Sequence, residues 1–284
     1  MQLMRLHQPI GMWLVFYPAA WALAFAQPAA LDGALLGLLF VGAVLMRSAG
    51  CIANDLADRR FDGAVARTAA RPLVTGAISP RHALYWLALL LTLSFGLTFL
   101  LPYPTQFLAL LVAPLVIAYP FMKRFSWWPQ VFLALVFNTS VLFAWQGALG
   151  EMQLETTLLY AAAALWTLGY DTLYALQDID DDARIGVKSS ARKLGRLVLP
   201  FCALCYMGMI VLLAYIALRF HMGGVFWAGL GVSAVLLGWQ IMAVWGRGNA
   251  LAGTAFRSNQ WVGLVVFLSI VADSYALMGG ITPR

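Results

Sequence analysis

The sequence predicts an all-α integral membrane protein whose nine transmembrane helices form one bundle. Three observations support this fold class: the composition, the spacing of long apolar stretches, and the distribution of basic residues. Of the 284 residues, 62% are hydrophobic and only 11% are charged, and the mean hydropathy is +0.82. Soluble domains are about half apolar and about a quarter charged. The composition therefore excludes an ordinary soluble domain, and the lipid bilayer is the expected surrounding.

A transmembrane helix needs roughly 20 mostly apolar residues, and nine stretches meet this requirement. In chain order they are residues 8–26, 31–50, 83–101, 105–122, 129–149, 156–176, 198–218, 225–245 and 260–278. Each is expected to be helical, because hydrocarbon cannot satisfy a free backbone N–H or C=O group. Pro18, Pro114 and Pro120 are compatible with helix, since neighbouring helices can satisfy the backbone groups that a proline frees. The whole chain, 1–284, is predicted to be a single domain.

The basic residues lie almost entirely on one side of this predicted topology. The N-terminal tail and the loops after the second, fourth, sixth and eighth spans hold 16 of the 18 Lys and Arg residues, which leaves Arg219 and Arg284 opposite. Cytoplasmic loops carry an excess of Lys and Arg. The split supports nine spans and predicts a multi-pass protein of the bacterial inner (plasma) membrane with a cytoplasmic N-terminus. It also accounts for the net charge of +6 without nucleic acid as a partner.

Seven of the 12 acidic residues are concentrated in two of these cytoplasmic connections, and an eighth, Asp171, lies near the end of the span before the second connection. The first polar group comprises Asn54, Asp55, Asp58 and Asp62, and the second comprises Asp171, Asp178, Asp180, Asp181 and Asp182. In a helix, the first three aspartates (i, i+3, i+7) share one face, and so would Asp171, Asp178 and Asp182 (i, i+7, i+11). Carboxylate oxygens on two facing helix ends suit Mg²⁺, which prefers one or two carboxylates plus substrate phosphate.

A similar basic phrase follows each acidic group, RTAARPL from Arg67 and KSSARKL from Lys188. This indicates a degenerate internal duplication, with two half-sites facing each other across a central cavity open to the cytoplasmic side. Metal ions and fixed basic side chains would together clamp a diphosphate group, which arginine grips in a bidentate manner and lysine as a point charge. Charged loops can also form ion-pair networks that only anchor helix ends. The repetition of both phrases on one side favours a functional site.

These motifs resemble those of the UbiA superfamily of intramembrane prenyltransferases, which has N-D-x-x-D-x-x-x-D after the second helix and D-x-x-x-D after the sixth. The phrases DRRFDGAVARTAARPL, YPFMKR, YDTLYALQDIDDD and GVKSS are most similar to the bacterial 4-hydroxybenzoate polyprenyltransferases of that superfamily, over essentially the whole chain. One phrase departs from the family pattern. The family often opens with R-x-x-R-P-I-G, whereas residues 5–11 here are RLHQPIG, with Gln8 at the second basic position.

The resemblance implies transfer of a polyprenyl group from polyprenyl diphosphate to the ring carbon ortho to the hydroxyl of 4-hydroxybenzoate, with release of diphosphate, in ubiquinone biosynthesis. Mg²⁺ is the implied cofactor, and no obligate protein partner is implied. Asp178 and Asp55 are the expected catalytic residues, with Asp178 as the base for the phenol proton. The implied ligands of Mg²⁺, directly or through diphosphate, are Asn54, Asp55, Asp58, Asp62, Asp178 and Asp182. The implied diphosphate-binding residues are Arg67, Lys123, Arg124 and Lys188. The residues implied to bind the aromatic substrate are Arg71, Tyr174 and Asp171. Arg67 is an alternative to Arg71 as the partner of the benzoate carboxylate.

Three alternatives were weighed against this interpretation. Other aromatic acceptors of the same family, namely naphthoate, homogentisate and porphyrin or haem, stay open from the residues alone. A phosphatidyltransferase motif is matched at Asp62-Gly63-x-x-Ala66-Arg67 and at Gly76, but Arg59 stands where its first aspartate belongs. A transporter would place ionisable groups near the middle of the membrane, whereas Asp171 and Asp273 are the main charges within the spans and both lie near span ends.

Overall fold

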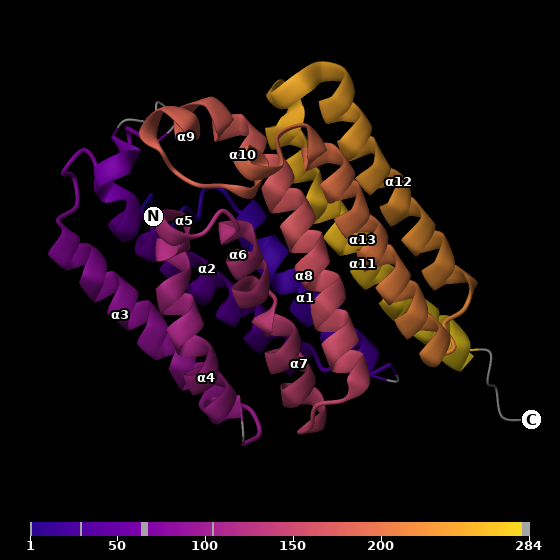
Figure 1. The fold of residues 1–284 in the computed structure, drawn as a ribbon. Helices are drawn as coiled ribbons and strands as arrows, with labels where there is room; N and C mark the ends of the chain where they lie inside the picture. Colours follow the sequence, from indigo (N-terminus) through magenta and orange to yellow (C-terminus); the bar gives the residue numbers. More distant parts are fainter. Residues whose placement is uncertain (1, 29, 64–67, 104, 280–284) are drawn as a thin grey trace, which may run out of the picture.

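The structure, a computed structural model, describes residues 2–28, 30–63, 68–103 and 105–279, and its ribbon is drawn in Figure 1. The regular elements within these ranges are helical. In chain order they are α1 (Ile10–Ala26), α2 (Gly33–Asp62), α3 (Pro80–Leu97), η1 (Thr98–Leu100), α4 (Thr105–Ala118), η2 (Tyr119–Phe121), α5 (Met122–Phe125), α6 (Pro129–Phe137), α7 (Thr139–Leu149), α8 (Leu154–Tyr174), η3 (Ala175–Asp178), α9 (Ile179–Ile185), α10 (Ser190–Leu194), η4 (Gly195–Leu197), α11 (Val198–Arg219), α12 (Gly224–Arg247), η5 (Gly248–Leu251) and α13 (Ala252–Gly279).

Helices cover most of each predicted apolar stretch, which confirms the all-helical fold class. Among the described residues, six segments are long and apolar enough to cross a membrane: Gly33–Arg59, Pro80–Leu100, Thr105–Phe125, Pro129–Leu149, Ser190–Arg219 and Gly224–Ala276. The last of these contains two helices, α12 and α13, joined at η5. The protein is therefore an integral membrane protein by the length and composition of its helices. The figure of nine spans stays a prediction.

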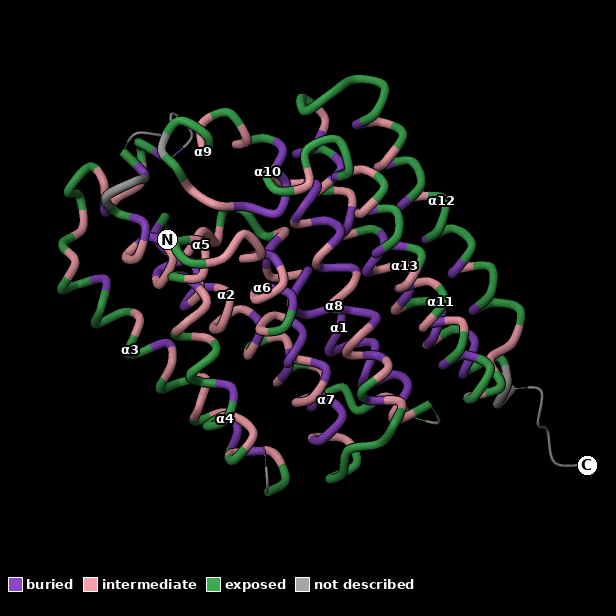
Figure 2. Tube along the Cα trace, viewed as in Figure 1, coloured by how far each residue is buried: buried purple, intermediate pink, exposed green. Residues whose placement is uncertain are grey.

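Helix α1 lies inside the bundle, where it packs against α2, α7, α8 and α13. Almost every residue from Gly11 to Phe25 is buried, which fits a helix that is apolar on all sides. Trp21 anchors it: its indole N–H donates to the carbonyl of Gly263 at 2.9 Å, and its ring lies 5.0 Å from that of Trp166. Figure 2 shows buried backbone along α1 and α8 and exposed backbone along α3, α4 and α12.

The outward faces of α3, α4 and α12 carry large apolar side chains. Tyr85, Leu111, Val235 and Met242 are all exposed, with 58% or more of each residue's surface accessible. A soluble monomer rarely exposes continuous apolar surface of this kind, and such a surface often marks contact with a membrane. These faces are the surfaces that lipid would cover.

Helix α2 is 30 residues long and continues past the predicted span to Asp62. The expected helical continuation that carries the first acidic group is therefore confirmed. The fifth stretch differs from a single helix, because Asn138 separates α6 from α7 with φ −86° and ψ 1°. The Asn138 amide donates to the carbonyl of Ala134 at 2.7 Å and to the hydroxyl of Thr167 at 2.8 Å, so side-chain hydrogen bonds hold this break.

The second acidic group does not form the single helical stripe that its spacing predicts. Helix α8 ends at Tyr174, the 3₁₀ turn η3 follows, and α9 begins only at Ile179. A 3₁₀ turn has three residues per turn instead of 3.6, so the rotational phase between Asp171 and Asp182 is lost across it. Helix α9 then ends at Gly186, whose φ of 75° is a left-handed conformation that glycine adopts without strain.

Candidate active site

Three aspartates of α2 form the most deeply buried group of charges in the described chain. Asp55, Asp58 and Asp62 are 2%, 5% and 7% exposed. Buried charges are expensive unless they are paired and hydrogen-bonded. Each of these carboxylates has a cationic partner, and the partners come from three segments far apart in sequence: Arg5, Arg71 and Lys123.

Arg71 holds the two ends of this aspartate row together. Its Nη1 lies 3.2 Å from Asp55 Oδ1 and 2.5 Å from Asp62 Oδ2, so one guanidinium spans two helical turns of α2. Arg5 Nη2 lies 2.5 Å from the same Asp55 Oδ1. The shared partner shows that Asp55 and Asp62 lie on one face of α2, as their i, i+7 spacing predicts.

Asp58 is paired through one oxygen only. Its Oδ2 contacts Lys123 Nζ, whereas its buried Oδ1 has no hydrogen-bond partner among the described atoms. A buried carboxylate oxygen without a partner is costly, and a hard cation or its bound water would satisfy it. The hard oxygen donors of α2 therefore fit Mg²⁺. Within the described ranges no group of three His, Cys, Asp or Glu side chains is placed to hold a metal ion.

The short segment around α5 contacts both the aspartate row of α2 and the basic phrase that begins at Lys188. Lys123 reaches Asp58, and Arg124 donates to the carbonyl of Ala57. These two contacts place the end of the fourth predicted span beside the first acidic group. From the other side, Lys188 Nζ donates to the carbonyl of Phe125 at 3.2 Å. Figure 1 shows α5, α9 and α10 at the same end of the bundle.

The second acidic group is spread over three elements: Asp171 lies in α8, Asp178 ends η3, and Asp180, Asp181 and Asp182 lie in α9, which a short loop joins to α10. Asp178 and Asp182 are half-buried and Asp180 is exposed. Arg192 shapes this loop, because its Nη1 donates to the backbone carbonyls of Asp182, at 3.1 Å, and of Val187. The backbone of Asp182 is therefore fixed by a side chain of the basic phrase that follows it.

Arg47 is a further cation of α2, eight residues and just over two helical turns before Asp55. It donates to Cys51 and packs against α1, where a Cβ in place of Gly11 would collide with its guanidinium. No described carboxylate lies within 4 Å of it. Arg47 is thus a half-buried cation without an ion-pair partner in the described chain.

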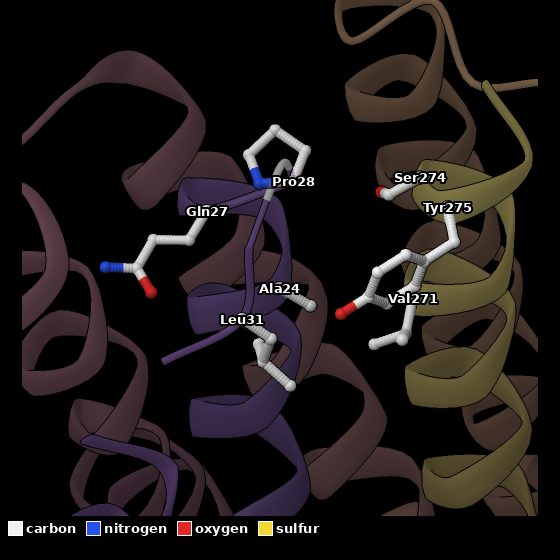
Figure 3. A pocket seen from close by; sticks show the side chains of 7 residues that line it. All are labelled: Ala24, Gln27, Pro28, Leu31, Val271, Ser274 and Tyr275. Atoms are coloured by element: carbon white, nitrogen blue, oxygen red, sulfur yellow. The ribbon is translucent and has the colours of Figure 1, made fainter. Parts of the chain in front are cut away.

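A small pocket lies at the far end of the bundle. It is lined by Ala24, Gln27, Pro28, Leu31, Val271, Ser274 and Tyr275, between the end of α1 and α13 (Figure 3). Helix α2 begins near it, at Gly33, and a helix rises 1.5 Å per residue, so Asp58 lies about 38 Å away along α2. This pocket is therefore separate from the aspartates. The predicted central cavity stays a prediction.

Comparison with known proteins decides the family. The sequence profile of the UbiA prenyltransferase family matches residues 15–272. The chain belongs to the UbiA prenyltransferase family. Among its relatives, the 4-hydroxybenzoate octaprenyltransferase of Pseudomonas aeruginosa (strain UCBPP-PA14) is 41% identical over 280 residues, which cover 97% of this chain and 93% of the relative. The protein of the same name from Chromohalobacter salexigens is 38% identical over 278 residues, 98% of this chain and 93% of the relative.

Solved structures of this family share the fold. The apo structure of a UbiA homologue from Aeropyrum pernix K1 has a TM-score of 0.80 and 26% identity, over 92% of this chain and 97% of that one. A UbiA homologue from Archaeoglobus fulgidus bound to DMAPP and Mg²⁺ has a TM-score of 0.71 and 18% identity, over 98% of each chain. The second likeness concerns the fold alone.

In this prenyltransferase the sequence-predicted residues fall into different positions. Lys123 and Arg124 reach the aspartate row, and Lys188 reaches α5, whereas Arg67 lies outside the described residues. Arg71 is paired with Asp55 and Asp62, and its expected contact with the aromatic substrate stays a prediction. Asp171 and Tyr174 are half-buried near the end of α8, and the Tyr174 ring lies 4.3 Å from that of Phe256.

Sequence reasoning missed two cations of the site, Arg5 and Arg47. The opening phrase RLHQPIG holds a residue that relates to each cation. Arg5 of this phrase pairs with Asp55, and Gly11 leaves room for the guanidinium of Arg47. His7 and Gln8, where the phrase departs from the family pattern, are exposed. The substitution at position 8 therefore leaves the pairing of Arg5 intact.

Proposed function

We propose that this UbiA prenyltransferase transfers a polyprenyl group from polyprenyl diphosphate to the ring carbon ortho to the hydroxyl of 4-hydroxybenzoate. The allylic C–O bond breaks and its electron pair leaves with diphosphate. A C–C bond forms at the ring, and the ring carbon then loses its proton. The relatives named 4-hydroxybenzoate octaprenyltransferase are 41% and 38% identical over nearly the whole chain, and their names support this acceptor. We propose that the reaction is the prenyl-transfer step of ubiquinone biosynthesis.

The observation that carries the proposal is the row of three buried aspartates matched by Arg5, Arg71 and Lys123. A cluster with balanced charges inside an apolar protein costs desolvation energy, and a helix end needs no such cluster for anchoring. Its basic members are flexible enough to exchange a carboxylate oxygen for a phosphate oxygen, and both acceptors suit a guanidinium fork. A diphosphate bound here would meet hydrogen-bond donors from three separate segments. Arg67, Arg124 and Lys188 are proposed as additional donors.

Mg²⁺ is the proposed cofactor. Its ligands, directly or through diphosphate, would be Asn54, Asp55, Asp58, Asp62, Asp178 and Asp182. When bound, Mg²⁺ would neutralise part of the negative charge that develops on the leaving diphosphate. Structures of UbiA homologues bound to DMAPP and Mg²⁺, and to GPP and Mg²⁺, support this choice. Asp178 is proposed to take the phenol proton, with Asp55 a further catalytic carboxylate.

For the benzoate carboxylate, Arg47 is a stronger candidate than Arg71. Arg71 already pairs with two carboxylates, whereas Arg47 has no ion-pair partner among the described residues. An Arg47→Met variant should raise the KM for 4-hydroxybenzoate about 10- to 100-fold, since a hydrogen bond to a charged group contributes about 1.5–3 kcal/mol. Its KM for polyprenyl diphosphate should not change. The matched variant Arg71→Met should show the reverse pattern.

The acceptor is tested with the purified protein in lipid nanodiscs. Diphosphate release and prenylated product are measured with 4-hydroxybenzoate, a dihydroxynaphthoate and homogentisate, each with allylic diphosphates of several chain lengths. The proposal expects the highest kcat/KM with 4-hydroxybenzoate. A higher value with another acceptor would reassign the substrate, and the absence of diphosphate release with every pair would refute prenyl transfer.

The membrane arrangement is part of the proposal. Both acidic groups and the N-terminus are proposed to face the cytoplasm of a bacterium, around a cavity that opens to that side, within nine spans of the inner membrane. The split of basic residues supports this orientation. Cysteines placed one at a time in residues 63–70 and 183–190 should react with an impermeant reagent from the same side. Labelling from opposite sides would refute the topology.

A further inference from the structure

Three cations of the second basic phrase gather around one indole ring. Trp127 lies between α5 and α6, and the charged groups of Lys188, Arg192 and Lys193 lie 5.9, 5.4 and 6.0 Å from its ring centroid. None of the three is within 4 Å of a carboxylate in the part of the chain that the structure describes. The indole is thus the shared contact of three side chains that repel one another.

An aromatic face can offset such repulsion. A cation within about 6 Å of an indole centroid is attracted by the negative face of the ring, and tryptophan is the strongest of the aromatic partners. Lysine and arginine side chains repel one another when they cluster, unless a group with negative charge or negative potential faces them. Trp127 supplies that face, and it is half-buried, so water screens the contact incompletely.

The contacts of these cations connect the two half-sites. Arg192 holds the backbone carbonyls of Asp182 and Val187, and Lys188 donates to the carbonyl of Phe125, just two residues before Trp127. On the other side of the same short segment, Lys123 contacts Asp58 of the first acidic group. A continuous chain of contacts therefore runs from Asp58 through the α5 segment and Trp127 to the loop of Asp182.

We propose that Trp127 is a positioning residue that holds the second basic phrase against the first half-site, so that both halves meet one diphosphate. This rests on the proposed function, since it assigns a role within the same diphosphate site. In this role Trp127 acts through Arg192, which holds the backbone at Asp182, and through Lys188, whose ammonium group is proposed to bind diphosphate.

The neighbouring residue, Trp128, provides a matched control. Trp128 is also half-buried, but its ring packs against that of Phe201 at 5.7 Å and no contact with a cation is recorded for it among the described residues. Trp127→Leu and Trp128→Leu remove the same volume from neighbouring positions. A purely structural role would give the two variants similar kinetics and similar losses of thermal stability.

The test is steady-state kinetics in nanodiscs with each substrate varied in turn. Trp127→Leu should raise the KM for polyprenyl diphosphate about tenfold, because several cation–π contacts are lost together. The KM for the aromatic acid should stay within about twofold of wild type, and Trp127→Phe should recover part of the loss because it keeps an aromatic face. Trp128→Leu should keep wild-type KM values.

A double-mutant cycle then asks whether Trp127 acts through Arg192. Arg192→Lys keeps the charge but cannot hold both carbonyls with a planar fork. Its effect on the KM for polyprenyl diphosphate should be much smaller in the Trp127→Leu background than in wild type, since coupled residues are non-additive. Additive effects would overturn the proposal, as would a wild-type KM in Trp127→Leu or equal losses in the two tryptophan variants. If the wild-type protein released no diphosphate at all, the proposed function itself would fail instead.

Discussion

The ion pair between Asp58 and Lys123 can separate a structural from a functional role of the buried aspartates. Asp58 is 5% exposed and its second oxygen has no described partner, so Lys123→Met would leave a buried carboxylate uncompensated. Removing one partner of such a pair costs about 3–5 kcal/mol, which corresponds to a fall in Tm on the order of 10 °C. Asp58→Asn should cost less, under about 1 kcal/mol, because the Lys123 side chain is 27% exposed and can turn towards water.

The double variant gives the decisive result. Asp58→Asn with Lys123→Met removes both charges, so its Tm should return close to that of Asp58→Asn alone. Its rate of diphosphate release should nevertheless stay about 10²–10³-fold below wild type, the usual loss when one electrostatic stabiliser of a transition state is removed. Thermal unfolding in detergent and a continuous diphosphate assay measure the two quantities on one preparation. If the double variant recovered activity along with stability, the pair would be a structural ion pair and the assignment of Asp58 would be wrong.

Further predictions concern the metal, the α5 segment and the second acidic group. Chelation should abolish diphosphate release and added Mg²⁺ or Mn²⁺ should restore it, while full activity in chelator would exclude the proposed cofactor. Arg124→Lys should raise the KM for polyprenyl diphosphate and leave that for the aromatic acid unchanged, because lysine lacks the planar fork; wild-type values for both would make Arg124 a membrane anchor only. Asp182→Ala should nearly abolish turnover and Asp180→Ala should be mild, since Asp180 is exposed on the same loop; the opposite order would contradict the assignment of this loop.

A fourth prediction in this set concerns stability alone. Asp273, 1% exposed, accepts the backbone N–H groups of Gly223, Val225 and Phe226 at 2.5, 3.1 and 3.1 Å, which caps the start of α12. Asp273→Ala should lower the free energy of unfolding by about 2–4 kcal/mol with unchanged KM values, and Asp273→Asn, which keeps one acceptor oxygen, should lose less. A kinetic defect without a loss of Tm would show a role beyond capping.

The sequence was sufficient to predict that the aspartates of α2 lie on a helical continuation of the second apolar stretch, because that signal is local. Charges are rare in this chain, so three aspartates at i, i+3 and i+7 stand out, and the same helix that makes the second apolar stretch simply continues through them. The periodicity of a helix then fixes a shared face without any knowledge of neighbours.

The partners of these aspartates could not be predicted in the same way, because they depend on tertiary packing. Arg5 and Arg71 precede and follow α2 by many residues, and only the folded bundle brings them together on Asp55. The break at Ala175–Asp178 has no local signal either, since that segment contains neither glycine nor proline. The convergence of three cations on Trp127 likewise joins two loops that are more than 60 residues apart.

The two half-sites are unequal, and the inequality suggests how charge is managed before substrate arrives. On α2, the three aspartates are matched by three cations in ion pairs. On the second loop, Lys188, Arg192 and Lys193 rest on an indole, which offsets their repulsion but does not neutralise them. The same loop also carries Asp178, Asp180, Asp181 and Asp182, so neither half-site offers diphosphate a large excess of positive charge. A diphosphate that bound the cations of α2 would take them from a carboxylate, and another positive charge would have to replace them there. That requirement is the physical reason to expect diphosphate and a divalent cation to bind together.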